Sequence, residues 1–379
     1  MIRFLKSKKD TINCPKRVKG FANRKIMREI LVKTPTAENG IRIGKGCVQE
    51  LGALLSGSKN FLLIDETVYG LYADKFDGYF AENEIFILPA GEENKNFRVL
   101  ENILARMLEA CLDRSSKLVV VGGGVVGDIG GLAASLYMRG ISYIQIPTTL
   151  LAQIDSSVGG KTAVDLSGVK NAVGAFYQAE VTLIDPLFLK TLPNSEWKSG
   201  FGELVKYAGL NSEIFRILEE NSERVMDGDE RILTALISAC VAHKAGVVER
   251  DEKDEGERKS LNLGHTTAHA LELSFKLSHG ESVLYGLALE TLYALHVGVC
   301  EKGYGERYLS LVQKFLNREP RKNIDLSCVE EWTKTAKFDK KNSQNKITLV
   351  VTKNVGEWTG VELSFDEYLE RMRASVQSL

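Results

Sequence analysis

The first half of the chain alternates short apolar runs with amphipathic stretches. Runs rich in Val, Ile, Leu and Phe, each bounded by polar or turn residues, predict β-strands. Between two of these runs, residues 94–112 repeat their apolar positions with a period of 3.6 and predict a helix. This alternation predicts a largely parallel sheet that helices cover on both faces. The expected strands are residues 29–33, 41–44, 61–65, 84–88, 117–121, 143–146 and 181–185.

The pattern changes near Leu192. Nearly all of residues 196–316 follow the helical period, as residues 229–249 illustrate. We therefore expect an α/β protein with a Rossmann-like parallel-sheet domain over residues 29–190 and a mostly α-helical domain over residues 191–379. At 379 residues the chain is long enough for two domains, because single cores rarely grow past about 250–300 residues.

Residues 1–28 form a basic N-terminal extension. They hold ten Lys or Arg and a single acidic residue, Asp10, without the apolar core of a secretory signal. The segment is also poor in serine for a transit peptide, so a flexible, solvated extension is the favoured interpretation. Met27 is an alternative start, since the regular pattern begins just after it.

Composition narrows the class of protein. Hydrophobic residues make up 44% of the chain and charged residues 26%, as in ordinary globular proteins. A net charge of −1 predicts no general affinity for nucleic acid, and no run approaches the about 20 apolar residues that cross a bilayer. Six scattered cysteines without a CxxC pair are typical of a reducing compartment. We expect a soluble cytoplasmic protein without nucleic-acid or membrane partners.

Histidines gather in one segment of the predicted helical domain. Of five histidines, His265, His269 and His279 fall within residues 261–281, and Glu203 precedes them in the same helical region. The first two are four residues apart, so their rings project from one face of a helix. A lone histidine is usually a core or surface group. Two imidazoles with a carboxylate and an open position, however, are the ligand set of a catalytic zinc site.

A glycine-rich turn suggests a nucleotide. Gly122, Gly124 and Gly127 match GxGxxG between a predicted strand and a helix, where backbone N–H groups could approach a pyrophosphate. The acid that an ordinary Rossmann unit needs at the end of the next strand is missing, and Gln145 is the polar residue there. A dinucleotide is therefore expected, bound in a different manner. Polar segments also follow two other strand ends, at residues 89–95 and 147–149.

Residues 154–178 look like a long polar loop. Asp155, Lys161, Lys170 and Asn171 lie among paired glycines, which suits a phosphorylated or carboxylated ligand. A flexible surface loop is the alternative, but the position directly after residues 147–149 favours binding.

Further cations accompany the histidine cluster. Lys206 lies three residues after Glu203, and Lys244, Arg258 and Asn262 precede the histidines. Several cations around a divalent metal imply an anionic substrate, because unpaired buried cations are costly. His269 then suits proton transfer better than a fourth place at the metal.

Long segments of the sequence resemble the 3-dehydroquinate synthase family of the sugar-phosphate cyclase superfamily. They run in order over nearly all of residues 29–356. The segments are GEENK, GGGVVGD, YMRG, PTTLLAQIDSSVGGKT, KNAVGAFYQ, TLPNSEWKSGFGELVKY, RKSLNLGHTTAHALE, SHGESV and DKK.

The resemblance implies a reaction. It implies a protein, usually a homodimer in this family, that holds NAD and one zinc or cobalt ion. Such a protein would convert 3-deoxy-D-arabino-heptulosonate 7-phosphate into 3-dehydroquinate and phosphate, the second step of the shikimate pathway. NAD oxidises a hydroxyl so that phosphate can leave, and the hydride then returns, so no cofactor is consumed.

The resemblance also implies roles for single residues. The metal ligands would be Glu203, His265 and His279. Contacts to NAD would come from Asp65, Glu92, Lys95, Gly123, Gly124, Asp128, Thr148, Thr149, Lys170 and Thr191. The substrate would be held by Asp155, Lys161, Asn171, Lys206, Lys244, Arg258, Asn262 and Lys340, with Arg139 reaching a phosphate across the dimer interface. The catalytic groups would be His269, Asp254, Lys161 and Arg258.

Some positions depart from the family. Asp254 stands where the family often has glutamate, and a shorter carboxylate weakens its expected role as a proton acceptor. Thr267, Ala268, Ala163 and Asp165 also differ from common family residues, for which we expect local repacking.

Three other functions stay open at the level of sequence. A sister cyclase that forms 2-deoxy-scyllo-inosose or a valiolone would share the metal ligands. An NAD- and zinc-dependent polyol dehydrogenase would share the fold but release NADH. A catalytically inactive binding protein is the third alternative, although the expected groups are present apart from the change at Asp254.

Overall fold

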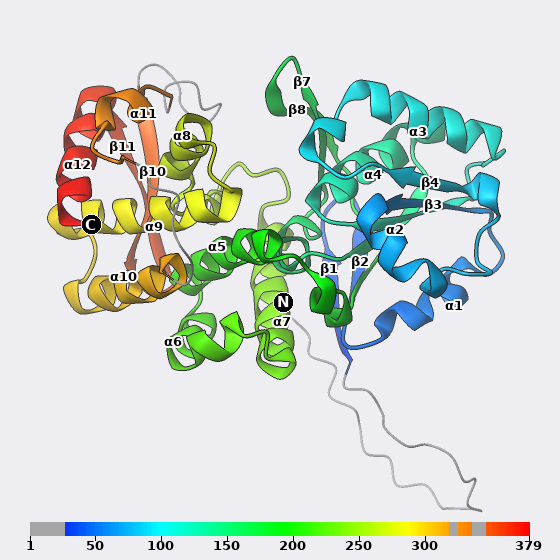
Figure 1. The fold of residues 1–379 in the computed structure, drawn as a ribbon, viewed down its shortest axis with the longest axis horizontal. Coiled ribbons are helices and arrows are strands. Elements are labelled where there is room, and N and C mark those ends of the chain that lie inside the picture. Colours follow the sequence, from blue (N-terminus) through cyan, green and yellow to red (C-terminus); the bar gives the residue numbers. More distant parts are fainter. Residues whose placement is uncertain (1–26, 318–324, 336–345) are drawn as a thin grey trace, which may run out of the picture.

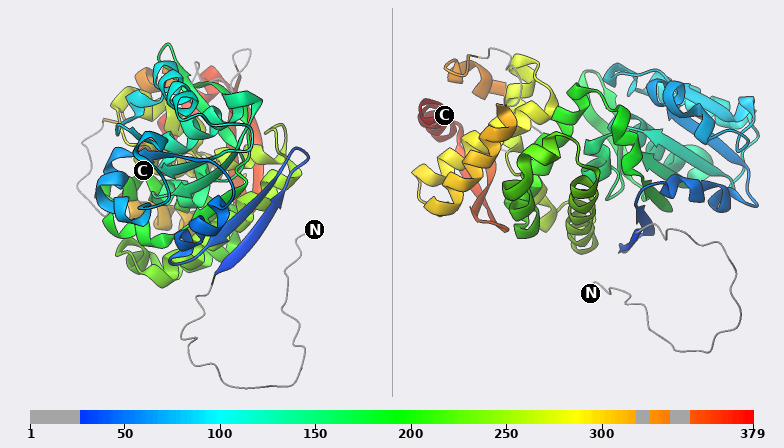
Figure 2. Two further views of the ribbon diagram at one scale, coloured as in Figure 1. Left: turned by 90° about the vertical axis from the view of Figure 1, so that its right-hand side faces the viewer. Right: turned by 60° about the horizontal axis from the view of Figure 1, so that its bottom comes forward.

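The fold was obtained as a computed structural model, which describes residues 27–317, 325–335 and 346–379. The basic N-terminal extension expected from the sequence lies outside the described residues except for its last two positions. One half of the molecule is a β-sheet with helices on both faces, and the other half is mostly helical, as Figures 1 and 2 show. Helices α5 (Asn194–Leu210) and α7 (Glu230–Arg250) lie between the two halves.

The seven-stranded sheet confirms the strand–helix alternation. Its order is β1-β2-β9-β6-β5-β3-β4; β1 pairs with β2 in antiparallel fashion and the other pairs are parallel. Every strand expected from the sequence is present in it. The strands are β1 (Arg28–Lys33), β2 (Glu38–Ile43), β3 (Asn60–Asp65), β4 (Ile85–Leu88), β5 (Lys117–Gly122), β6 (Ser142–Pro147) and β9 (Val181–Ile184).

Alternate residues of the central strands pack into two separate apolar clusters. In β3, Leu63 points to a cluster that contains α3 (Phe97–Glu109) and α4 (Gly124–Leu136). Its neighbours Leu62 and Ile64 point to a second cluster with α1 (Leu51–Leu55). Both faces are therefore buried, which explains why these strands read as continuous apolar runs. Helix α2 (Glu66–Tyr72) follows β3 directly.

Residues 154–178 are not the long loop that the sequence suggested. They begin in a single turn of π-helix, η6 (Ala152–Ser156), and continue as an antiparallel hairpin of β7 (Lys161–Leu166) and β8 (Val169–Phe176). In β7, Thr162 and Val164 are buried while their neighbours are not. Glycines and small polar residues hide this alternation in the sequence. The hairpin packs on α4 and projects from the sheet half.

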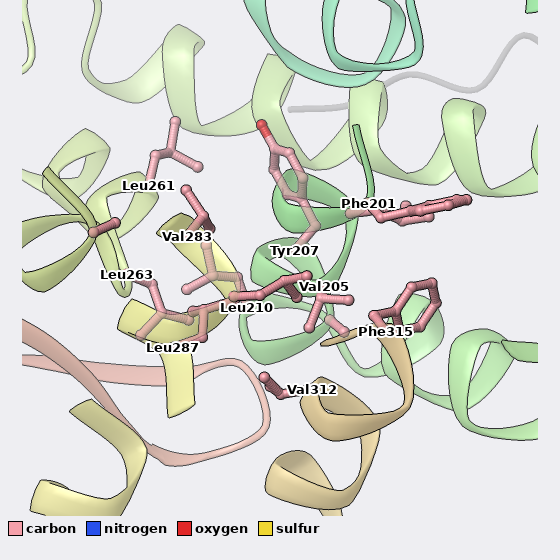
Figure 3. Close-up of a cluster of buried hydrophobic side chains, with 14 of the residues drawn as sticks. Phe201, Val205, Tyr207, Leu210, Leu261, Leu263, Val283, Leu287, Val312 and Phe315 are labelled. Atoms are coloured by element: carbon pink, nitrogen blue, oxygen red, sulfur yellow. The ribbon is translucent and has the colours of Figure 1, made fainter. Parts of the chain in front are cut away.

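The second half has the expected helical character with one addition. The strands β10 (Lys346–Asn354) and β11 (Glu357–Ser364) form an antiparallel hairpin that the sequence did not reveal. One large apolar cluster unites the helices, and Figure 3 shows part of it around Val205, Leu263 and Val312. The remaining helices are α6 (Ser212–Met226), α8 (His265–Phe275), α9 (His279–His296), α10 (Lys302–Leu316), α11 (Val329–Thr335) and α12 (Phe365–Ser378).

Helix α7 is long and apolar enough to pass a test for membrane spans. Its mean hydropathy reaches 1.5 over 18 residues, but 61% of that window is buried inside the protein. A core helix of a soluble protein has these properties, so the helix is not evidence for a membrane location.

The backbones of helices α5 and α9 are in close contact at two glycines. A Cβ on Gly202 would lie 2.4 Å from the carbonyl oxygen of Gly280, and a Cβ on Gly280 would lie 2.2 Å from that of Lys198. Backbone atoms cannot move aside as a flexible side chain can. The crossing therefore fixes the distance between the residues that follow Gly202 and those that precede Gly280.

We expect Gly202→Ala to lower the free energy of unfolding by about 1–3 kcal/mol, because overpacking forces the two backbones apart. Urea denaturation would measure it. Gly70→Ala on α2 is the matched control, since a Cβ there meets nothing within 4 Å and alanine is the better helix former. Equal midpoints for Gly202→Ala and the parent protein would show that the crossing tolerates a methyl group.

Candidate active site

Three side chains from three helices converge beside the α5–α9 crossing. Glu203 comes from α5, and His265 and His279 are the first residues of α8 and α9. One ligand atom from each lies within 4.8 Å of the other two. Oε1 of Glu203 lies 3.1 Å from Nε2 of His265 and 2.8 Å from Nε2 of His279. The structure thus brings together the three residues for which the sequence suggested a metal.

Each imidazole is oriented through its second nitrogen. Nδ1 of His265 lies 3.0 Å from the carbonyl oxygen of Leu263, and Nδ1 of His279 lies 3.3 Å from Oε2 of Glu272. Because these acceptors can take the Nδ1–H of each ring, the Nε2 atoms of both rings are directed at the common point beside Glu203.

A buried carboxylate holds the start of α8. Glu290 accepts the backbone N–H of Gly264 at 3.1 Å and that of Thr267 at 2.9 Å. Gly264 has φ +75°, where a Cβ would also collide with the backbone of Leu287. An anion at a helix N-terminus satisfies unpaired N–H groups and complements the helix dipole. Glu290 therefore fixes the place from which His265 enters the site.

Burial and neighbouring charges shift the pKa values of all three residues of the triad. Burial acts to raise the pKa of Glu203, but Lys206 and the two imidazoles hold it well below its usual range. Burial lowers the pKa of His265 to about 4, whereas hydrogen bonds to Glu203 and Glu272 overcome burial and raise the pKa of His279 to about 9. At neutral pH a metal would therefore bind a neutral His265 and displace a proton from His279.

Asp155 is the centre of a second buried cluster. It lies in the π-helical turn η6, a feature that is frequent at functional sites. Its carboxylate accepts hydrogen bonds from Lys206 at 2.8 Å, from Lys244 and from the hydroxyl of Tyr207 at 3.2 Å. Lys206 also pairs with Glu203, so the two clusters are joined.

These ion pairs correct one argument from the sequence. Lys206 and Lys244 were expected as unpaired cations that call for an anionic ligand, but Asp155 pairs with both. The two lysines alone therefore do not require such a ligand. Burial, with Arg258 and Lys206 nearby, lowers the pKa of Lys244 to about 8 in spite of Asp155.

We expect Asp155→Asn to lower the free energy of unfolding by about 3–5 kcal/mol, because it leaves the buried ammonium group of Lys244 without its carboxylate and leaves Lys206 with Glu203 alone. Denaturant titration would measure the loss. The exposed pair of Lys346 and Glu362 offers a control, since Glu362→Gln breaks an ion pair in water and should leave the midpoint unchanged. An unchanged midpoint for Asp155→Asn would contradict this assignment of the pairs.

Three further expected groups, Lys161, Asp254 and Arg258, lie near this cluster. Nζ of Lys161 lies 2.5 Å from Oδ2 of Asp254, whose φ of 64° is in the left-handed region. The buried guanidinium of Arg258 donates to the carbonyl oxygens of Glu252 and Gly159, while its Nε has no hydrogen-bond partner in the described part of the chain. Lys161 thus approaches the Asp155 cluster from β7, and Arg258 approaches it from the turn before α8.

The expected nucleotide residues gather at the carboxyl ends of the parallel strands. Asp65 caps α2 through the N–H groups of Thr67 and Val68. Gly123 is the N-cap of α4. A Cβ added to Gly123 would lie only 3.0 Å from Cγ2 of Thr149, so glycine leaves room for that side chain. Gly124 begins α4, and Thr148 follows β6 directly. Ligands of open α/β sheets bind at this edge, where a helix N-terminus attracts phosphate.

Other nucleotide candidates are tied to neighbouring elements. Lys95 donates to Asp128 at 2.5 Å and to Asn171 at 2.6 Å, and so links the segment after β4 with α4 and the β7–β8 hairpin. Glu92 begins the short turn η4 (Glu92–Asn94) just before Lys95. The hydroxyl of Thr191 lies 2.8 Å from the hydroxyl of Tyr72.

One expected residue, Arg139, is not brought to the site. Arg139 follows α4 at its C-terminal end, which is about 20 Å from the N-terminal turn for a 13-residue helix. Lys340 lies outside the described residues. The ring of His269 lies 5.6 Å from that of His265 on α8, as the spacing predicted. Asn262 ends the short helix η8 (Glu257–Asn262) just before α8.

Sequence reasoning missed three residues that shape the site: Tyr207, Glu272 and Glu290. Glu272 could have been found, because it follows His265 by seven residues and His269 by three, and so shares their helix face. Tyr207 and Glu290 contact the site through the tertiary fold and carry no local signal.

A divalent metal fits the donor set of the triad. Two imidazole nitrogens and a carboxylate oxygen are directed at one point, both rings have an outer partner, and no fourth protein ligand joins them among the described residues. Three protein ligands with an open position are typical of catalytic zinc.

The architecture is shared with solved sugar-phosphate cyclases. It resembles a 2-deoxy-scyllo-inosose synthase complexed with carbaglucose-6-phosphate, NAD+ and Co2+ (TM-score 0.77, 22% identity, 92% of this chain and 100% of that one). It also resembles a 2-epi-5-epi-valiolone synthase from Streptomyces hygroscopicus with NAD+ and Zn2+ (TM-score 0.76, 23% identity, 96% and 99%). The fold is that of the sugar-phosphate cyclases.

Sequence comparison identifies the family. The 3-dehydroquinate synthase N-terminal model matches residues 85–199 and the C-terminal model matches residues 200–342. The 3-dehydroquinate synthase of Clostridium acetobutylicum is 43% identical over 84% of this chain and 91% of its own length, and that of Alkaliphilus metalliredigens is 39% identical over 90% and 97%. The chain belongs to the 3-dehydroquinate synthase family, as its sequence motifs predicted, and is an enzyme of the carbon–oxygen lyase class.

Proposed function

We propose that the protein converts 3-deoxy-D-arabino-heptulosonate 7-phosphate into 3-dehydroquinate and phosphate with NAD and a divalent metal, zinc or cobalt. The convergence of Glu203, His265 and His279 on one point supports it most directly. Membership of the family supports the substrate, and the two solved cyclases with NAD+ and Co2+ or Zn2+ support the cofactors.

The triad residues would hold the metal, and the residues around the β5–α4 turn would hold NAD. When bound, the metal would stabilise negative charge on substrate oxygens, and NAD would accept a hydride and return it. Gly123 permits the close approach that a pyrophosphate needs, and the N-terminus of α4 supplies N–H groups to it.

The chain's own residues would bind and orient the substrate between the two halves. Lys161 and Arg258 would hold its anionic groups, with Lys206, Lys244, Asn171 and Asn262 around its hydroxyls. His269, on the same face of α8 as His265, would hold or release the proton that moves when phosphate leaves. Asp254, already paired with Lys161, would hold that ammonium group in position.

We also propose a homodimer in the cytoplasm. Arg139 is too far from the site of its own chain, and it is flanked by the exposed apolar side chains of Leu136 and Met138. An exposed apolar patch around a cation suits a subunit interface that delivers Arg139 to a partner's phosphate site. The scattered cysteines suit a reducing compartment.

Phosphate release would test the function. With NAD and Zn2+ present, the purified protein should release phosphate from the heptulosonate phosphate and accumulate no NADH, because the hydride returns to the product. Sedoheptulose 7-phosphate, glucose 6-phosphate and glycerol serve as comparison substrates. Turnover of one of the other two sugar phosphates alone would assign a sister cyclase, and NADH formed from glycerol would assign a dehydrogenase.

A further inference from the structure

Glu272 connects the proposed metal site with the other half of the molecule. It lies on α8, seven residues after His265, and its side chain is only 18% exposed. Its Oε2 lies 3.3 Å from Nδ1 of His279, and its Oε1 accepts a hydrogen bond from Nζ of Lys170 at 2.8 Å. Each carboxylate oxygen thus has its own partner, and the two partners belong to different halves of the fold.

We propose that Glu272 is a positioning residue that holds His279 for the metal and links this ligand to the β7–β8 hairpin through Lys170. The inference rests on the proposed metal site and adds the connection of its ligand His279, through Glu272, to the hairpin.

The contact with His279 needs such a support. His279 is the first residue of α9 and its side chain is 33% exposed, whereas that of His265 is only 10% exposed. Packing therefore restrains the ring of His279 less than that of His265. An acceptor for Nδ1–H fixes the ring orientation and the tautomer, and it makes Nε2 a stronger donor to a metal.

The contact with Lys170 extends the link across the molecule. Lys170 lies in β8, in the hairpin that packs on α4 of the sheet half. The ammonium group of Lys170 and the imidazole N–H of His279 both interact with the negative charge of the Glu272 carboxylate. Displacement of the hairpin would remove Lys170 from Glu272 and so change the strength of the hydrogen bond between Glu272 and His279. The position of the hairpin is thereby coupled to the metal ligand.

Zinc affinity of the metal-free protein, without NAD or substrate, tests the inference. A competing chromophoric chelator reports the dissociation constant for each variant. We expect Glu272→Ala to weaken zinc binding about 10–100-fold, as loss of an outer partner of a ligand typically does. Glu272→Gln, which keeps an acceptor without the charge, should fall between Glu272→Ala and the parent. The Co2+ absorption band should shift in both variants.

Glu281→Gln is the matched control. Glu281 also lies at the start of α9, but its carboxylate joins a capping box with Ser278, a role that glutamine also fills. Its zinc affinity should stay within about twofold of the parent.

The link to the hairpin is tested by Lys170→Met. This substitution should change zinc affinity when it is made in the parent protein, and it should have no further effect when it is made in Glu272→Ala.

The outcomes separate the inference from the proposed function. If His265→Ala keeps its zinc, the proposed metal site itself is wrong. If His265→Ala loses zinc while Glu272→Ala binds it like the parent, only the role of Glu272 fails. If Glu281→Gln weakens zinc binding as much as Glu272→Ala does, the effect belongs to the start of α9 in general. If the effects of Lys170→Met and Glu272→Ala on zinc affinity are additive, the link to the hairpin is contradicted.

Discussion

His265→Ala is expected to lose the metal and the activity together. The imidazole supplies one of three donors at a site without a fourth protein ligand among the described residues, and alanine cannot replace it. Removing the metal removes the stabilisation of developing negative charge, so turnover should fall by about 10³-fold or more. Elemental analysis after dialysis and the phosphate-release assay would measure the two losses on the same sample.

His296→Ala is the control for this variant. His296 ends the helix that His279 begins, and it is exposed, with Ser378 as its neighbour. Its replacement should leave metal content and turnover unchanged. Equal metal content in His265→Ala and the parent would contradict the assignment of His265 as a ligand.

His269→Ala is expected to keep the metal and to slow turnover by about 10²–10⁴-fold, the usual contribution of a positioned acid–base group. The ring lies on the ligand face of α8, but it is absent from the three-residue cluster. Its loss should therefore affect kcat while zinc content stays at one ion per chain. Steady-state kinetics beside metal analysis would measure both. A fully active variant would exclude the acid–base role, and loss of zinc would make His269 a ligand instead.

The strands and helices could be predicted where the hydrophobic pattern is strong. Every strand of the main sheet was found, because its buried residues form apolar runs that Gly, Pro and polar residues interrupt. The β7–β8 hairpin was missed, since Thr162 and Val164 alternate with small or polar neighbours in a segment rich in glycine. The β10–β11 hairpin was missed because a mostly helical region was expected to continue.

The site could be predicted in composition but not in its internal pairing. The spacing of His265 and His269 indicates one helix face, and that information is local. The meeting of Glu203 with His279 depends on the α5–α9 crossing at Gly202, over 76 residues of sequence. The pairing of Asp155 with two lysines is equally non-local, so the sequence overstated the number of free cations.

The most direct test of the metal triad is X-ray diffraction from crystals grown with zinc, with anomalous data collected on both sides of the zinc absorption edge. We expect one ion per chain, bound by a carboxylate oxygen of Glu203 and Nε2 of His265 and His279, each at about 2.0–2.2 Å. A zinc peak at another place, or an ion that one of these three side chains does not reach, would contradict the account.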